Sequence, residues 1–440
     1  MTNVSTFLQP RLKKPKLTLI FHFPLFKFHF SFYNLTTNSR KSRRIFTFYF
    51  KNHIHKELLC INMVIFSALS SFFYQKSTNF VAKTKTIMLE EAIQLLQQLI
   101  ATPSISRDEQ KAADIMQNYL QIKGFQPKRH GNNVWALSSG FSEQKPTILL
   151  NAHIDTVKPV NGWQHLPFQP CLEGERLYGL GSNDCGGGLV SLLQVFMALS
   201  NNEKAPSRPF NLIYLASCEE EVSGKNGIES VLPLLPPINF AIVGEPTGMQ
   251  PAIAEKGLMV IDATAHGKAG HAARNEGDNA IYRALTDIAW IQQYKFPKQT
   301  ALLGPVKTTV TIINAGTQHN VIPDTCTFTI DVRSNECYTN EEIFAVLQAN
   351  MQSELHARSF RLSSSSISEE HPFVKRCKAL GMKPFGSPTL SDQALMRFPS
   401  LKLGPGESSR SHTADEFILV SEIKQAIDCY LQLLDDFRFE

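Results

Sequence analysis

Residues 210–221 read FNLIYLASCEEE, an apolar run that ends in three consecutive carboxylates. A continuous apolar run of this length predicts a strand that is buried on both faces. The three adjacent acids repel one another, so the triplet is either a solvated turn or a site that binds positive charge. Three further apolar runs also lead to a histidine or an acid: 147–152 before His153 and Asp155, 239–244 before Glu245, and 400–404 before His412.

These four runs alternate with helical patterns, which predicts an α/β fold with a mostly parallel sheet flanked by helices. In open α/β sheets, ligands bind at the carboxyl ends of the strands. Each of the four runs delivers its histidine or acid at that end. The sequence therefore predicts a single site that is assembled from the ends of four strands.

The pattern changes in the middle of the chain, where apolar and polar residues alternate as they do in half-exposed antiparallel strands. Helical patterns lie between and after the alternating runs. This mixture predicts a separate α+β domain. The alternating runs are 258–267, 307–316 and 325–334, and the helical patterns are 279–293 and 340–355.

We expect this α+β domain to cover residues 257–360 and to be inserted into a catalytic domain. The catalytic domain would then consist of residues 88–256 and 361–440. The serine run at 363–366 is the expected return linker, and the amphipathic pattern at 421–437 predicts the closing helix.

Residues 1–87 differ in composition from the remainder of the chain. They hold fourteen Lys and Arg against one acid, Glu57, so residues 88–440 carry 30 basic and 38 acidic side chains. The overall charge of +5 therefore does not indicate nucleic-acid binding by the main body. The leader also holds 14 of the 30 Phe and shows no helical or strand periodicity over a useful length.

Four interpretations of residues 1–87 are open: a translated region upstream of a start at Met88, a transit peptide, a membrane anchor or an extra domain. We expect that the leader is not part of the fold, because MLEEAIQLLQQLI from Met88 predicts a clean amphipathic helix. The uncharged stretch 58–73 is short for a membrane span, so membrane attachment is not expected.

Seven of the eight cysteines lie in residues 88–440, where they are scattered and form no C-x-x-C pair. An odd number of dispersed cysteines is typical of reduced thiols and not of a disulfide framework. We therefore expect a cytoplasmic protein.

Hydrolysis of an amide at neutral pH requires a nucleophile and a polarised carbonyl, and two neighbouring metal ions can supply both. Such a site requires one carboxylate that bridges the ions and a pair of further ligands on each ion. A set of two imidazoles and three carboxylates favours zinc over magnesium or calcium. The candidate ligands are His153, Asp184, Glu221, Glu245 and His412.

Asp184 lies in the glycine-rich stretch GLGSNDCGGG at 179–188, which precedes a long apolar helical pattern. A carboxylate at such a turn is well placed to reach a buried ion. The alternative is a phosphate-binding loop, but the stretch matches neither G-x-x-x-x-G-K-[ST] nor G-x-G-x-x-G.

Five motifs occur in order along the chain: His153-x-Asp155, GLGSND at 179–184, a Glu pair at 220–221, GEPT at 244–247 and H-T-x-x-E at 412–416. Together they resemble the zinc-dependent amidohydrolase family that includes acetylornithine deacetylase, succinyl-diaminopimelate desuccinylase and related carboxypeptidases and aminoacylases. The resemblance covers essentially all of residues 88–440. It implies hydrolysis of an N-acyl amino acid, with N-acetylornithine as the first choice. Succinyl-diaminopimelate, acetyl- or succinyl-citrulline and peptides are the alternatives.

The resemblance also implies a role for each site residue. Two divalent ions would be bound, most readily Zn²⁺, with Co²⁺ able to substitute. Glu220 would be the general base, and Glu219 would only flank the pair, although a register shifted by one would give these roles to Glu219 and Glu220. The remaining roles are His153 and Glu245 on one ion, Glu221 and His412 on the other, Asp184 as the bridge, and Asp155 as the residue that orients His153.

In the inserted domain, His271 matches the histidine that stabilises the oxyanion across a dimer interface, which implies a homodimer. The alternative is that His271 only caps a helix. Asn320, Arg333 and Gly406 match positions that contact the substrate carboxylate, although Arg333 could instead form a surface ion pair.

Two departures from the family pattern concern the site. Cys185 and Gly186 stand where a hydrophobic residue and Lys are common. Arg410 lies two residues before His412 in a lead-in that differs from the common one, and this position alone suggests that it could contact substrate. A non-catalytic dimeric binding protein with the same fold is the alternative from another class, but neither a ligand nor the base is missing.

Overall fold

The computed structural model describes residues 4–7, 17–23, 26–32, 85–200, 208–274 and 276–439. The chain divides into two compact units between Lys83 and Thr84. The first unit contains an antiparallel sheet of β1 (Val4–Phe7), β2 (Leu17–Phe23) and β3 (Phe26–Phe32). The expectation that this stretch lacks strand periodicity is therefore wrong for FKFHFSF, which alternates over the seven residues of β3. Residues 58–73 lie outside the described residues.

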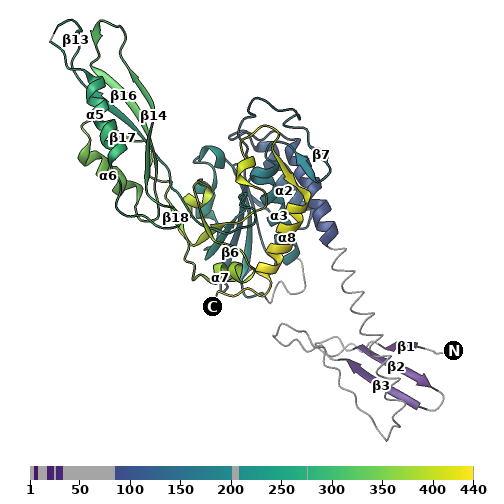
Figure 1. Cartoon of the computed structure of the whole chain (residues 1–440). Coiled ribbons are helices and arrows are strands. Elements are labelled where there is room, and N and C mark those ends of the chain that lie inside the picture. Colours follow the sequence, from purple (N-terminus) through teal and green to yellow (C-terminus); the bar gives the residue numbers. More distant parts are fainter. Residues whose placement is uncertain are drawn as a thin grey trace. The chain divides into compact units, whose positions relative to one another are not determined.

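The second unit is built around a mixed nine-stranded sheet with the order β18-β11-β20-β10-β6-β9-β5-β4, in which β19 pairs with β11 (Figure 1). Its four central strands are parallel and arise from the four apolar runs. The predicted α/β class is thus confirmed, and antiparallel strands add the edges. The central strands are β20 (Ser400–Lys402), β10 (Phe240–Val243), β6 (Thr147–His153) and β9 (Asn211–Ser217).

The outer strands of this sheet are short, and they pair with their neighbours in antiparallel register except for β19. They are β4 (Lys128–His130), β5 (Asn133–Leu137), β11 (Ala252–Glu255), β18 (Ser365–Ser366) and β19 (Phe385–Ser387). The expected return linker at 363–366 therefore contributes a strand to the sheet.

The central strands are buried on both faces because successive side chains point to opposite sides. In β6, Ile148 and Leu150 join a large apolar cluster with α3, whereas Leu149 joins a second cluster with α4. Burial on both faces explains why these strands are continuous apolar runs. The helices of this part are a helix over 85–100, α2 (Gln110–Ile122), α3 (Gly187–Ser200), α4 (Ile228–Val231), α7 (Pro372–Ala379) and α8 (Val420–Leu434).

The inserted segment has its own antiparallel sheet with the order β14-β16-β12-β17. In β12, alternate residues from Met259 to Ala265 are buried and form a separate apolar cluster with the helices of the segment. The alternation predicted for this region is thus present. The elements of this sheet and its helices are β12 (Met259–His266), α5 (Ala280–Gln293), β14 (Lys307–Ala315), β16 (Thr325–Arg333), α6 (Asn340–Asn350) and β17 (Glu354–Ala357). Two further short strands, β13 (Gly270–His271) and β15 (Val321–Ile322), pair with each other in antiparallel register.

The helix predicted over 340–355 is too long, because α6 ends at Asn350 and a strand follows. The backbone amides of Gln352 and Ser353 donate to the Asp287 carboxylate of α5 at 3.0 and 2.8 Å. This contact draws the chain out of the helix, and it cannot be seen in the local sequence.

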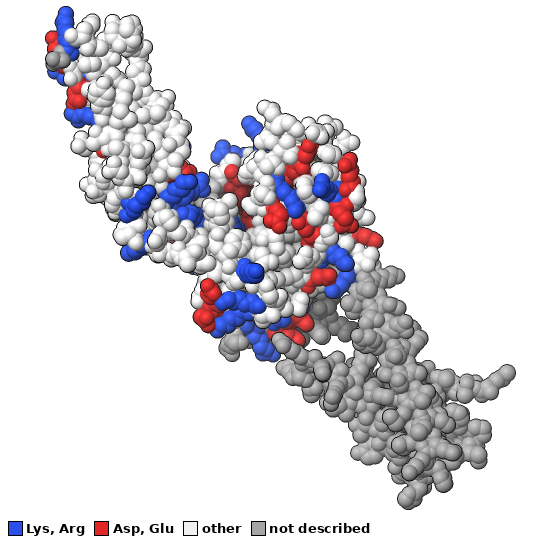
Figure 2. Space-filling model, viewed as in Figure 1, with Lys and Arg blue, Asp and Glu red and all other residues white. Residues whose placement is uncertain are grey.

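A small three-stranded sheet consists of β7 (Cys171–Glu173), β8 (Arg176–Tyr178) and β21 (Phe417–Leu419), and it joins the segment before α3 to the segment before α8. Figure 2 shows acidic and basic side chains interspersed over the visible face of the part of the second unit that contains the nine-stranded sheet. Among the described residues, no helix is both long enough and apolar enough to span a bilayer. The seven cysteines of residues 88–440 are free.

Candidate metal centre

The first half of the candidate site lies at the end of β6. His153 pairs with Ser217 at the end of β9, and its side chain is only 1% exposed. Its Nδ1 lies 2.9 Å from the backbone oxygen of Asp155 and 3.6 Å from the carboxylate of that residue. With Nδ1 held in this way, Nε2 faces Asp184 Oδ1 at 3.2 Å and Glu245 Oε1 at 3.6 Å.

Asp184 lies on a turn that a buried carboxylate holds in place. Glu416 accepts hydrogen bonds from the backbone amides of Gly181, Asn183 and Asp184 at 2.8–3.0 Å. The glycines that follow permit close packing, since a Cβ at Gly188 would overlap the carbonyl oxygen of Gly244. The glycine run therefore serves the approach of α3 to the end of β10.

The second half of the site is a loop histidine paired with an acid of the glutamate triplet. His412 Nε2 lies 2.8 Å from Glu221 Oε2 and 3.7 Å from Asp184 Oδ2. This hydrogen bond to Glu221 raises the pKa of His412 to about 9. Asp184 therefore faces His153 with one oxygen and His412 with the other, which is the arrangement that a bridging ligand requires.

The three glutamates of the triplet have different surroundings. Glu219 has a left-handed backbone with a φ of 55°, and its carboxylate accepts hydrogen bonds from Asn226. Residues Glu220–Val222 form a 3₁₀ turn. The side chains of the triplet are therefore separated by a turn of the backbone.

The Asp155 carboxylate fixes the position of this turn. Its two oxygens accept the backbone amides of Glu220 at 3.0 Å and Glu221 at 3.1 Å. Ser106 Oγ donates to it at 2.7 Å. Burial raises the pKa of the Glu220 carboxyl well above its usual range, and the charge of Glu245 adds to this effect.

The residues present fit a pair of divalent cations. Glu245 Oε1 is buried and has no hydrogen-bond partner among the residues that the structure describes. Burial raises the pKa of Glu245 to about 8, and the charge of Asp184 adds to the shift. Buried acids this close together are stabilised by positive charge. Donor atoms of His153, Asp184 and Glu221 lie within 4.8 Å of one another, as do those of His153, Cys185 and Glu245. The mixture of imidazole and carboxylate donors suits zinc and similar ions.

The other predicted site residues lie apart from this cluster. His271 and Asn320 belong to the inserted segment, where the His271 ring accepts the amide of Ala273 at 3.1 Å. Arg333 donates to Asp331 of its own strand at 2.9 and 3.1 Å. Among the described residues, none of these three has a hydrogen bond or an ion pair with the cluster.

Gly406 and Arg410 lie on the polypeptide that leads to His412. Gly406 has a φ of 82°, and a Cβ there would overlap the side-chain oxygen of Asn183. Arg410 donates to both carboxylate oxygens of Glu422, at 2.8 and 3.0 Å, and its guanidinium lies 4.6 Å from the centre of the Phe417 ring. Its charged group is therefore already paired.

Three residues beside the site had no predicted role. Glu416 fixes the Asp184 turn, and only its place in the H-T-x-x-E motif could have signalled it. Asp392 accepts a hydrogen bond from Ser217 Oγ at 2.6 Å below the end of β9. Cys185 donates from its thiol to the carbonyl of Gly244 at 3.2 Å, and the departure from the family pattern was its only signal.

The fold and the cluster together define a metal-dependent amide hydrolase. Residues 149–436 match the sequence pattern of peptidase family M20/M25/M40, and the chain belongs to this family.

Individual relatives agree with this assignment. The chain is 28% identical over 387 residues to an acetylornithine deacetylase of Proteus mirabilis, covering 80% of this chain and 98% of the relative. It is 30% identical over 265 residues to a succinyl-diaminopimelate desuccinylase of Blochmanniella pennsylvanica, covering 56% of this chain and 68% of the relative. A dinuclear metal-binding M20 peptidase of Bacillus subtilis has a similar fold, with a TM-score of 0.60, 18% identity and coverage of 79% and 98%.

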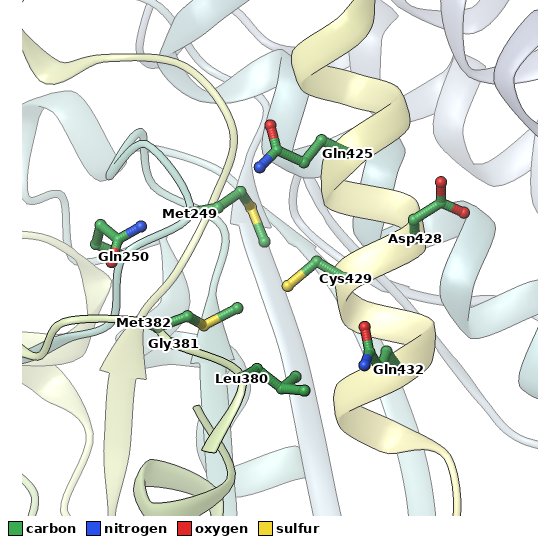
Figure 3. A pocket seen from close by; sticks show the side chains of 9 residues that line it. All are labelled: Met249, Gln250, Leu380, Gly381, Met382, Gln425, Asp428, Cys429 and Gln432. Atoms are coloured by element: carbon green, nitrogen blue, oxygen red, sulfur yellow. The ribbon is translucent and has the colours of Figure 1, made fainter. Parts of the chain in front are cut away.

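A surface pocket of about 320 Å³ lies away from the cluster, between α8 and the turn after Met249 (Figure 3). Its lining is partly apolar, with Met249, Leu380 and Met382 on one side and Gln425, Cys429 and Gln432 of α8 on the other. It includes none of the predicted ligands, so the candidate site is the cluster and not this pocket.

Proposed function

We propose that residues 88–440 hydrolyse the amide bond of an N-acyl amino acid at a two-metal centre, with N-acetylornithine as the first candidate substrate. One observation carries the proposal. Asp184 stands between His153 and His412, and each of these imidazoles is also close to a glutamate of its own. The similarity to an acetylornithine deacetylase over 98% of that relative supports the choice of substrate.

In this proposal, His153 and Glu245 would hold one ion, Glu221 and His412 would hold the other, and Asp184 would contribute a carboxylate oxygen to each. When bound, two such ions act as Lewis acids for the amide carbonyl and provide a nucleophile at neutral pH. Zn²⁺ is the first candidate, and Co²⁺ is expected to replace it.

Glu220 is the proposed general base. The Asp155 carboxylate accepts the backbone amide of Glu220, which fixes the backbone that carries the proposed base. Burial beside Glu245 raises the pKa of Glu220, which makes its carboxylate a stronger proton acceptor; once protonated, the carboxyl can return the proton to the leaving amine.

The inserted segment, residues 257–360, is proposed to mediate a homodimer and to bring His271 of one copy to the site of the other. Its edge strand β14 exposes Ile312 and Ile313, and α5 exposes Tyr282 and Leu285. Figure 2 shows few charged side chains over much of the visible face of this segment. Asn320, Arg333 and Gly406 are the proposed contacts of the substrate carboxylate. The seven cysteines of residues 88–440 are scattered and free, which supports a proposed location in the cytoplasm.

A panel of N-acyl amino acids tests the proposal. The full chain, loaded with zinc or cobalt, is given N-acetylornithine, succinyl-diaminopimelate, acetyl-citrulline and a dipeptide, and the release of each product is measured. We expect the highest kcat/KM with N-acetylornithine. If only another member of the panel were hydrolysed, the substrate assignment would be wrong, but the proposed amide hydrolysis would be retained.

Two variants separate catalysis from binding. Glu220→Gln should lower kcat about 10²–10⁴-fold while two metal ions remain bound. Glu143→Gln, which changes an exposed glutamate, is the matched control. If the parent chain were no faster than Glu220→Gln on every substrate, the alternative of a non-catalytic dimeric binding protein would take its place.

A further inference from the structure

A second group of metal-ligating side chains lies outside the proposed centre. Donor atoms of His165, Cys171 and Glu173 lie within 4.8 Å of one another. A nitrogen, a sulfur and a carboxylate oxygen together are the donor set of a thiophilic divalent cation. Neither the family motifs nor the proposed reaction uses any of these residues.

The small sheet places these side chains on one face. Cys171 and Glu173 are two residues apart in β7, so their side chains point the same way. Cys171 pairs with Tyr178 of β8, and the His165 ring stacks on the Tyr178 ring with centroids 4.0 Å apart and planes inclined by 8°. The strand register and this stacking bring the imidazole to the thiol and the carboxylate.

Asp415 orients the imidazole. Its Oδ1 lies 3.0 Å from His165 Nδ1 and also accepts the backbone amides of Gln164 and His165 at 3.0 and 2.9 Å. A carboxylate can only accept, so Nδ1 carries the proton and the Nε2 lone pair points away from Asp415. Metal-binding histidines are commonly held by a carboxylate in this manner.

The distances suit a tetrahedral ion. Bonds of about 2.0–2.3 Å to nitrogen, oxygen and sulfur give donor separations of about 3.3–3.6 Å around tetrahedral zinc. His165 Nε2 lies 3.5 Å from Glu173 Oε1, and Cys171 Sγ lies 3.8 Å from the same oxygen. Small side-chain movements would therefore complete the coordination.

The guanidinium of Arg176, the nearby positive charge, does not occupy the space between the three donor atoms. Arg176 of β8 lies opposite Glu173 in the strand register, but it donates to the Tyr178 hydroxyl at 3.3 Å and lies over the Phe417 ring. The Glu173 side chain is 61% exposed and that of His165 is 23% exposed, so an ion can enter from solvent.

We propose that His165, Cys171 and Glu173 form a third metal site for a thiophilic divalent cation such as Zn²⁺ or Cd²⁺, with a fourth position open to solvent. Binding replaces the S–H bond of Cys171 with a sulfur–metal bond and releases one proton to solvent. Asp415 is a positioning residue. It belongs to the loop that also carries His412, so an ion bound through His165 would stabilise that loop against β7.

Metal counting and cobalt spectroscopy test this proposal independently of the substrate. The full chain is dialysed against Zn²⁺ or Co²⁺, the bound metal is counted, and the near-ultraviolet charge-transfer band of a cobalt–thiolate bond is recorded. We expect three ions per chain and a thiolate band. Cys171→Ser should retain two ions and lose the band, whereas Cys337→Ser, which changes a partly exposed thiol elsewhere, should keep both features.

The proposal is overturned if Cys171→Ser binds as many ions as the parent chain, or if the band disappears only in Cys185→Ser. A milder variant provides a second measurement should Cys171→Ser fail to fold. Asp415→Asn keeps an oxygen for the two backbone amides but removes the charge, and it should weaken only the third ion, by about 10–100-fold. If Asp415→Asn bound every ion with unchanged affinity, Asp415 would not position His165 for metal binding.

Discussion

The two halves of the proposed metal centre differ in how firmly the protein holds them. His153 ends a central strand and its side chain is 1% exposed, whereas His412 lies in a loop, has a φ of 59° and is 52% exposed. The buried half is fixed by the sheet before any ion binds. In the open half, the His412 side chain is held by its hydrogen bond to Glu221. We therefore expect that a bound ion would contribute most to fixing the position of His412.

The largest effect should come from the one ligand that the two halves share. Asp184→Asn keeps the shape of the side chain but removes the charge between His153 and His412, so both ions should bind weakly. Activity should fall by more than the roughly 10²–10⁴-fold expected for loss of the proton-transfer group alone. Metal content and kcat/KM are measured together, with Asp108→Asn, an exposed acid, as the control. Retention of two tightly bound ions would show that Asp184 does not link the halves.

Replacement of His153 should lower the stability of the protein more than replacement of His412. In the metal-free chain, His153→Ala leaves buried acids without a partner and should lower the free energy of unfolding by about 1–3 kcal/mol. His412→Ala breaks a half-exposed pair and should cost less than about 1 kcal/mol. Urea unfolding of both variants without metal measures the difference. Equal losses would mean that the sheet does not hold the buried half more firmly.

The sequence predicted the buried half more completely than the open half, for a physical reason. Strands buried on both faces appear as continuous apolar runs, and parallel strand ends meet at one edge, so His153 and Glu245 could be brought together by pattern alone. His412 follows a loop without periodicity, and only the order of motifs placed it. The turn at Glu219, the end of α6 and the pairing of Arg410 depend on contacts between residues distant in the chain. Local sequence therefore could not predict them.

A smaller effect is expected from the residue that connects the buried strand to the glutamate pair. Asp155→Asn leaves only one carboxamide oxygen where two carboxylate oxygens accept the amides of Glu220 and Glu221. We expect metal affinity or kcat to fall about 10–100-fold, as for other residues that orient ligands. Ser106→Ala, which removes one neutral donor to the same carboxylate, is the milder control. A loss in Asp155→Asn as large as that of Asp184→Asn would make Asp155 a ligand and not an orienting group.

The smallest effect on activity should follow from replacement of Arg410, which lies in the open half but whose guanidinium is already paired with Glu422. Its guanidinium binds both oxygens of Glu422, and its side chain is 19% exposed, so little of its charge is available to a substrate carboxylate. Arg410→Gln should therefore change KM less than about twofold and lower stability by about 1 kcal/mol.

Arg333 also donates to both oxygens of a carboxylate, that of Asp331, but in the proposed role it would leave Asp331 to bind the substrate carboxylate. Loss of a charged contact of about 1.5–3 kcal/mol in Arg333→Gln should therefore raise KM about 10–100-fold. Steady-state kinetics on the preferred substrate measure both variants. A tenfold rise in KM for Arg410→Gln at unchanged kcat would mean that Arg410 leaves Glu422 when substrate binds. The open half would then rearrange around substrate as well as around metal.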